Sequence, residues 1–159
     1  MSFEIRRPSP NCSPVPRNEQ LGVCFHHTVL SFDQTLVRMM DPASQVSYHV
    51  IIALDGTRCT LVDDDKIAWH TGSSVFMGRS GCNNFLLGCA FVGDTYVDPL
   101  TSRQLDSAMD WLAVRWHKRG WNASNMTDHR QISPARKNDL NPVEWKRLIA
   151  RIKARFPAP

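Results

Sequence analysis

The run Leu21-Gly22-Val23-Cys24-Phe25-His26-His27-Thr28 decides how this chain folds. Its first five residues are apolar or small, which is typical of a strand buried on both faces. Polar residues follow at once, where a buried strand delivers side chains to the carboxyl edge of a sheet. The run therefore predicts an α/β fold with a functional site at the end of this strand.

A second stretch supplies further polar side chains. The loop Asp128-His129-Arg130-Gln131-Ile132-Ser133-Pro134-Ala135-Arg136-Lys137-Asn138-Asp139 brings an imidazole, cations and carboxylates close together in the sequence. Two histidines and one aspartate from the two stretches would make a three-ligand set, and catalytic zinc is typically held by three protein groups and a water. Because alternate side chains of a strand face opposite ways, only one of His26 and His27 can face this site, and the spacing leaves both open.

Local patterns predict the other elements. Capping boxes stand at Ser31 with Gln34 and at Thr101 with Gln104. A hairpin-turn dipeptide stands at Asp55-Gly56, and a first-turn helix proline stands at Asn141-Pro142. They predict strands over 21–29, 47–54, 57–62 and 86–92, and helices over 33–40, after 101 and from 142. The expected fold is a single α/β domain, with a central mixed sheet of about five strands flanked by helices. Four of the ten prolines lie in residues 8–20, so residues 1–20 are interpreted as an N-terminal arm and residues 21–156 as the domain.

Composition limits the class of protein and its partners. The net charge of +4 permits a polyanionic partner, but much of it lies on the last predicted helix, where a solvated face is expected, so we expect no nucleic acid. Five irregularly spaced cysteines, with no Cys-x-x-Cys pair, indicate neither a disulfide framework nor a thiolate zinc site. The first residues lack the apolar core of a signal peptide, and no run reaches the ~20 residues of a membrane helix. The sequence predicts a cytoplasmic monomer without membrane insertion.

Six motifs recur in order along residues 21–150: Phe25-His26-His27-Thr28, Val46-Ser47-Tyr48-His49-Val50-Ile51, Asp55-Gly56-Thr57, Ala68-Trp69-His70-Thr71-Gly72, Gly81-Cys82-Asn83-Asn84-Phe85, and His129 through Asp139. In these motifs the chain resembles the type 2 N-acetylmuramoyl-L-alanine amidases. That family shares its fold with the peptidoglycan recognition proteins and the phage lysozyme-type amidases. The resemblance covers nearly the whole predicted domain.

The resemblance implies a role for each matched residue. It makes His26, His129 and Asp139 the ligands of a zinc ion, and Tyr48 and Lys137 the groups that stabilise the transition state when the zinc-bound water attacks. It also implies that a substrate groove is lined or supported by Trp69, His70, Arg79 and Asn83. Each of these four also has a structural interpretation: a core indole, a turn imidazole, a solvated cation and a loop cap.

Two positions and one segment bear on how the chain compares with its relatives. The AmpD-type amidases carry a glutamate at the position of Ala90, so this chain lacks that carboxylate. We expect Asp128 to lie at the surface or to support the site without becoming a fourth ligand. The segment between His26 and Tyr48 is short, which resembles broad-specificity members more than AmpD-type enzymes.

The implied activity is zinc-dependent hydrolysis of the amide between N-acetylmuramic acid and L-alanine, in peptidoglycan or muropeptides. Two alternatives stay open on the same fold: a noncatalytic peptidoglycan-binding module, and a regulatory protein that binds another enzyme. The setting is open as well. A recycling enzyme, an endolysin that reaches the wall after lysis and an exported effector all fit the sequence.

Overall fold

The computed structural model describes residues 3–159 and is built around one mixed β-sheet. Its six strands lie in the order β1 (Glu4–Arg6), β5 (Arg58–Thr60), β4 (Val50–Ile52), β9 (Leu86–Phe91), β3 (Gly22–His27) and β10 (Met126–Asp128). β4, β9, β3 and β10 run parallel, whereas β5 pairs antiparallel with β4 across the predicted Asp55-Gly56 turn. The α/β class is confirmed, with six strands in place of about five.

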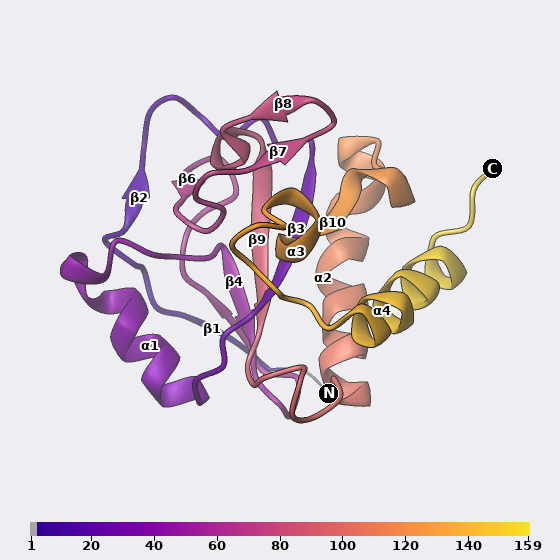
Figure 1. Ribbon diagram of the computed structural model, residues 1–159, viewed down its shortest axis with the longest axis horizontal. Coiled ribbons are helices and arrows are strands. Elements are labelled where there is room, and N and C mark those ends of the chain that lie inside the picture. Colours follow the sequence, from indigo (N-terminus) through magenta and orange to yellow (C-terminus); the bar gives the residue numbers. More distant parts are fainter. Residues whose placement is uncertain (1–2) are drawn as a thin grey trace.

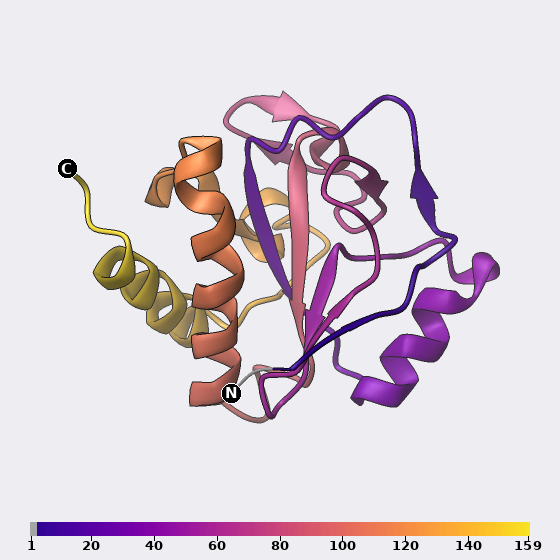
Figure 2. The same cartoon turned by 180° about the vertical axis from the view of Figure 1, so that it is seen from behind.

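Helices cover both faces of this sheet (Figures 1 and 2). They are α1 (Phe32–Met40), α2 (Ser102–Arg119), α3 (His129–Ile132) and α4 (Pro142–Arg155), with short 3₁₀ turns at Pro42–Ser44, Cys82–Asn84 and Ala123–Asn125. Both predicted capping boxes form, at Ser31 with Gln34 and at Thr101 with Gln104. α2 and α4 lie against one face, and α1 lies on the other. None of the helices in residues 3–159 is long and apolar enough to cross a membrane.

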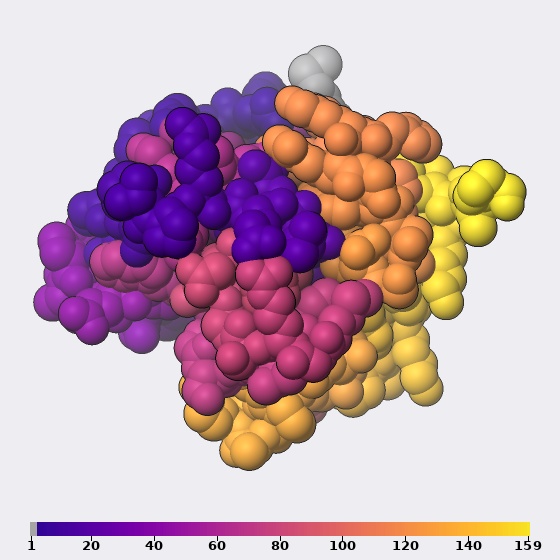
Figure 3. Space-filling model, turned by 90° about the horizontal axis from the view of Figure 1, so that it is seen from above, coloured from indigo at the N-terminus to yellow at the C-terminus, as the bar shows by residue number. Residues whose placement is uncertain are grey.

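The N-terminal segment, interpreted from the sequence as an arm, is built into the sheets. β1 pairs in parallel with β5 at the edge of the main sheet. β2 (Cys12–Ser13) pairs with β6 (Ile67–Ala68) in a separate two-stranded sheet. Elsewhere in the chain, β7 (Val75–Phe76) and β8 (Arg79–Ser80) form another two-stranded sheet. From above, this segment (indigo) covers part of the molecular surface beside the segment that holds β7 and β8 (Figure 3). It therefore contributes to the body of the domain.

The central strands β3 and β9 divide their side chains between the two faces. Large apolar side chains pack under α2 and α4 in the main hydrophobic core, among them Val23, Phe25, Leu87, Cys89 and Phe91. The alternate positions face α1 and the loops, and there His26 lies opposite Ala90 in the β3–β9 register. The face that carries His26 is thus lined by smaller side chains.

Candidate metal centre

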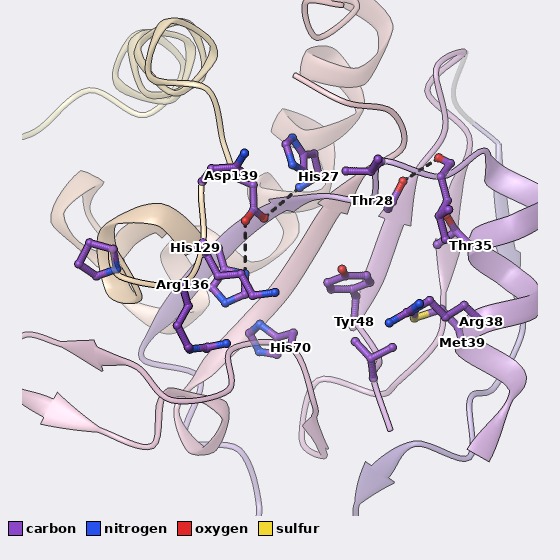
Figure 4. A pocket seen from close by; sticks show the side chains of 16 residues that line it. His27, Thr28, Thr35, Arg38, Met39, Tyr48, His70, His129, Arg136 and Asp139 are labelled. Carbon is purple, nitrogen blue, oxygen red and sulfur yellow. Dashed lines mark hydrogen bonds and ion pairs between the residues drawn. The ribbon is translucent and has the colours of Figure 1, made fainter. Parts of the chain in front are cut away.

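The candidate site lies where neighbouring parallel strands end. β3 ends at His27 and β10 ends at Asp128, and Asp128 stands opposite Phe25 in their register. His129, which begins α3 directly after β10, therefore reaches the level of His26. Asp139 comes from the loop between α3 and α4 and lies beside both rings. Figure 4 shows it next to His129. Residues from two distant stretches of the sequence thus meet at the carboxyl edge of the sheet.

The spacing of their donor atoms fits a tetrahedral metal ion. His26 Nδ1 lies 3.1 Å from His129 Nδ1, and the Asp139 carboxylate oxygens lie 3.6 Å from the first nitrogen and 3.5 Å from the second. Ligand distances near 2.1 Å in a tetrahedral zinc site put neighbouring donor atoms about 3.4 Å apart. All three side chains are buried. The residues present thus match zinc in both donor type and spacing.

Backbone carbonyls select the tautomers of the rings. His129 Nε2 lies 3.0 Å from the Thr71 carbonyl oxygen, which can only accept, so this nitrogen carries the proton and Nδ1 keeps its lone pair. His70 Nε2 lies 3.2 Å from the Leu86 carbonyl, which by the same logic leaves His70 Nδ1 as an acceptor. That acceptor lies 2.9 Å from His26 Nε2, so His26 also turns a bare Nδ1 toward the site.

Protonation states agree with this arrangement. Burial, followed by the neighbouring His129, lowers the pKa of His26 to about 4. Burial also lowers the pKa of His70 well below its usual value. Although burial acts to raise it, the adjacent rings of His129 and His26 lower the pKa of Asp139. His26 and His70 are therefore neutral and Asp139 is anionic near pH 7, as metal ligation requires.

The turn at residues 70–71 is held by Asn83. The Asn83 Oδ1 accepts from the backbone N–H of His70 at 3.0 Å and from the backbone N–H and hydroxyl of Thr71, both at 2.9 Å. Gly88 makes room for the His70 ring, because a Cβ atom there would lie 2.7 Å from its Cγ. Neither Thr71 nor Gly88 was predicted as a site residue, although a glycine inside a buried strand is a signal of close approach.

A cavity of about 720 Å³ opens beside the donor set, and two of the three donor residues, His129 and Asp139, line it. Tyr48 and Lys137 both line it, as the resemblance implies. The Tyr48 ring lies 5.0 Å from the His26 ring, centroid to centroid. Burial raises the pKa of Tyr48, so its hydroxyl stays protonated near neutral pH. Ala90 is fully buried in the cluster that Tyr48 packs against, and it has no polar group to offer.

The four residues expected at the substrate groove separate in the structure. His70 lines the cavity, but both of its ring nitrogens are engaged within the protein. Asn83 caps the loop beneath. Trp69 Nε1 donates to Ser13 Oγ at 3.0 Å, and Arg79 pairs with Glu19 at the surface. Among the residues that line this cavity, Trp69, Arg79 and Asn83 are absent.

His27 and Asp128 support the site from its other side. His27 turns away from the three donors, and its Nδ1 lies 2.8 Å from Thr95 Oγ1. The backbone N–H of His27 donates to the Asp139 carboxylate at 3.3 Å. Asp128 is fully buried, caps α3 through the Gln131 N–H and accepts from the Leu140 N–H at 3.0 Å. It ties down the backbone next to Asp139, as a supporting residue would.

Comparison with known proteins identifies relatives over most of the chain. A family model described as N-acetylmuramoyl-L-alanine amidase matches residues 16–142. The 1,6-anhydro-N-acetylmuramyl-L-alanine amidase AmpD of Citrobacter freundii is 39% identical over 110 residues, which are 67% of this chain and 57% of that protein. N-acetylmuramoyl-L-alanine amidase AmiD of Escherichia coli K12 is 28% identical over 144 residues, which are 78% of this chain and 50% of that protein. The chain spans about half the length of these curated relatives.

Solved structures show the same fold. A selenomethionine derivative of AmpD superposes with a TM-score of 0.79 at 28% identity, covering 92% of this chain and 93% of that one. A complex of Escherichia coli AmiD with the substrate anhydro-N-acetylmuramic acid-L-Ala-D-gamma-Glu-L-Lys gives a TM-score of 0.72 at 21% identity, covering 90% of this chain and 58% of that one. At that identity, the second likeness concerns the fold alone.

Proposed function

Because the chain belongs to the N-acetylmuramoyl-L-alanine amidase family, we propose that it hydrolyses the amide bond between N-acetylmuramic acid and L-alanine in peptidoglycan or muropeptides. The match to the family model and to the AmpD structure confirms the family that the sequence motifs predicted. We also propose that His26, His129 and Asp139 hold a zinc ion. The observation that carries both proposals is a set of three donors at tetrahedral spacing, with both imidazoles already in the metal-binding tautomer.

The chain prepares this chemistry through its ligands. When bound, zinc would act as a Lewis acid and lower the pKa of a coordinated water toward neutrality. Neither His26 nor His129 has to change tautomer to bind, because the carbonyls of Leu86 and Thr71 have already set the protons. The Asp139 carboxylate is oriented by the His27 N–H. A site organised before the metal and substrate arrive needs little rearrangement during the reaction.

Tyr48 and Lys137 are the proposed donors to the developing oxyanion. Both line the cavity that contains His129 and Asp139. The protonated Tyr48 hydroxyl can donate to the substrate carbonyl oxygen as negative charge builds on it. The Lys137 ammonium can add a charged donor from the loop that carries Asp139. One such donor is typically worth ~3 kcal/mol, or about 100-fold to 1000-fold in rate.

The proposed substrate class is an amino sugar that bears an acidic stem peptide. The Escherichia coli AmiD complex contains L-Ala-D-gamma-Glu-L-Lys joined to the anhydro sugar. AmpD is named for the same anhydro-muramyl group. We propose the same class of ligand here, in the cavity that His129 and Asp139 line. Its volume of about 720 Å³ lies within the range usual for small-molecule sites.

A noncatalytic peptidoglycan-binding module or regulatory protein is the alternative on this fold. The preorganised ligand set argues against it, since binding alone would not require two selected tautomers. Metal analysis of the purified protein, followed by mass spectrometry of products from sacculi and from muropeptides, tests the proposal. We expect close to one zinc per chain and release of peptides that begin with free L-alanine. Binding to sacculi without any cleavage by the zinc-loaded protein would instead support the noncatalytic module.

A further inference from the structure

The cavity above the metal centre is lined by more cations than anions. Its charged side chains, histidines apart, are Arg38, Arg136, Lys137 and Asp139. Asp139 is a proposed metal ligand, so its charge serves the metal. The other three charged side chains of the cavity wall are all cationic. A neutral amino sugar gives no reason for such a wall, whereas a peptide with free carboxylates does.

Arg38 reaches this cavity from α1. Thr35, Arg38 and Met39 all line it, and their spacing puts them on one face of the helix. Figure 4 shows the Arg38 side chain running from α1 toward Tyr48. Burial raises the pKa of Tyr48, while the positive charge of Arg38 opposes that rise, as expected for a guanidinium close to the phenol.

The other two cations, Arg136 and Lys137, already have hydrogen-bond partners or a proposed catalytic role. One guanidinium nitrogen of Arg136 donates to the carbonyl oxygens of Thr71 and Ser73, each at 3.0 Å, and so helps to hold the loop that orients His129. Lys137 is the proposed oxyanion donor. Arg38 has no such partner: within residues 3–159, it takes part in none of the side-chain hydrogen bonds or ion pairs found. Its fork of donors is free to meet a ligand.

We propose that Arg38 is a specificity-determining residue that binds the free α-carboxylate of the second residue of the stem peptide. This inference rests on the proposed amidase function. A γ-linked D-glutamate keeps its α-carboxylate, and that group lies about one Cα-to-Cα step of 3.8 Å beyond the L-alanine whose amide is cleaved. A guanidinium pairs with a carboxylate through two parallel hydrogen bonds, and it cannot do so with a carboxamide.

The test compares two substrates that differ only at this group. One is muramyl-L-Ala-D-γ-Glu-L-Lys, and the other carries a carboxamide in place of the glutamate α-carboxylate, as in D-isoglutamine. We expect kcat/KM of the zinc-loaded wild type to be at least about tenfold higher for the acid, the scale of a charge-assisted hydrogen bond. Arg38→Gln should lower kcat/KM for the acid until the ratio of the two substrates is close to one. Arg38→Lys should keep part of the preference.

Arg7→Gln is the matched control, because Arg7 is exposed beside the groove on the outer side of α1 and its loss changes the net charge equally. It should leave the preference intact. Equal rates on both substrates in the wild type, or a preference that survives Arg38→Gln, would overturn the inference and leave the amidase proposal standing. A preference lost in Arg136→Gln but kept in Arg38→Gln would overturn it too. Cleavage of neither substrate by the zinc-loaded wild type would overturn both.

Discussion

The two faces of β3 and β9 differ in the side chains that they carry and in what those side chains can do. Under α2 and α4, Phe25, Leu87 and Phe91 are fully buried among apolar neighbours. On the opposite face, the same strands present His26 to the metal centre, Gly88 to the His70 ring and Ala90 to the cluster that Tyr48 packs against. One pair of strands thus supports the core on one side and the candidate metal centre on the other.

The difference shows how the fold keeps stability and chemistry apart. The main hydrophobic core lies on the face under α2 and α4, here called the packed face, where apolar burial and close packing stabilise the fold. The face that carries His26 is called the site face. The small residues on the site face leave room for imidazole rings, whose hydrogen bonds end on backbone carbonyls. Changes on the packed face should therefore alter the free energy of unfolding, whereas changes on the site face should alter metal binding and catalysis.

The largest effect is expected from removing a metal ligand on the site face. His129→Ala should reduce bound zinc from about one equivalent to background and abolish hydrolysis, since a three-ligand site loses one ligand. Its fold should persist, which circular dichroism can check. Inductively coupled plasma mass spectrometry of the dialysed protein measures the metal, and full zinc content in this variant would remove His129 from the site.

A cavity on the packed face should instead destabilise the protein. Leu112 is fully buried between α2 and the sheet, so Leu112→Ala should cost ~2–5 kcal/mol in unfolding free energy. Val114→Ala is the control, because Val114 on the same helix is 74% exposed. Denaturant unfolding of the metal-free variants gives the two costs. Loss of zinc binding by folded Leu112→Ala protein would contradict the separation of the two faces.

Substitution of Tyr48 or Lys137 should lower the rate of hydrolysis without loss of bound zinc. Tyr48→Phe and Lys137→Ala are each expected to lower turnover about 100-fold or more, the scale of one oxyanion donor. Zinc content should stay near that of the wild type, because neither residue is a proposed ligand. Steady-state kinetics beside metal analysis decides between these outcomes, and unchanged turnover in both variants would refute the mechanism.

His70 should act on the metal without touching it. Its Nδ1 accepts from His26, so His70→Phe keeps a ring in the space above Gly88 but leaves His26 without an acceptor. Loss of such a partner typically weakens metal binding about 10-fold to 100-fold. His70→Asn offers an oxygen that can still accept and should lose less. Competition with a chromogenic chelator measures both affinities, and equal losses would point to a steric role alone.

The smallest effect concerns the sugar. Ala90 puts a methyl group where AmpD-type amidases are expected to carry a glutamate, and the segment that contains α1 is short. The site should therefore discriminate little between anhydro-muramyl and ordinary muramyl peptides, with kcat/KM values within about tenfold, or ~1.4 kcal/mol. Parallel kinetics on the two substrates test this. A thousandfold preference for the anhydro form would show that other residues read the sugar.

Much of the fold could be read from the sequence, because its signals are local. Both capping boxes join residues three positions apart, and the Asp55-Gly56 turn sets the β4–β5 pair that it connects. The strand β9 could be predicted because it is a short apolar run. β1 and β10 were not predicted: each is three residues long and depends on a neighbouring strand for its hydrogen bonds.

By itself, the sequence determined the family, the apolar strands, and the short list of imidazoles and carboxylates from which a site could be built. Only the tertiary structure decided which of them meet. His26 faces His129 and Asp139, whereas His27 contacts Thr95. The residues that line the cavity do not include Trp69, Arg79 or Asn83. The physical reason is distance along the chain. The carbonyls that set the tautomers of His70 and His129 lie 16 and 58 residues away, and no spacing within a motif reports such contacts.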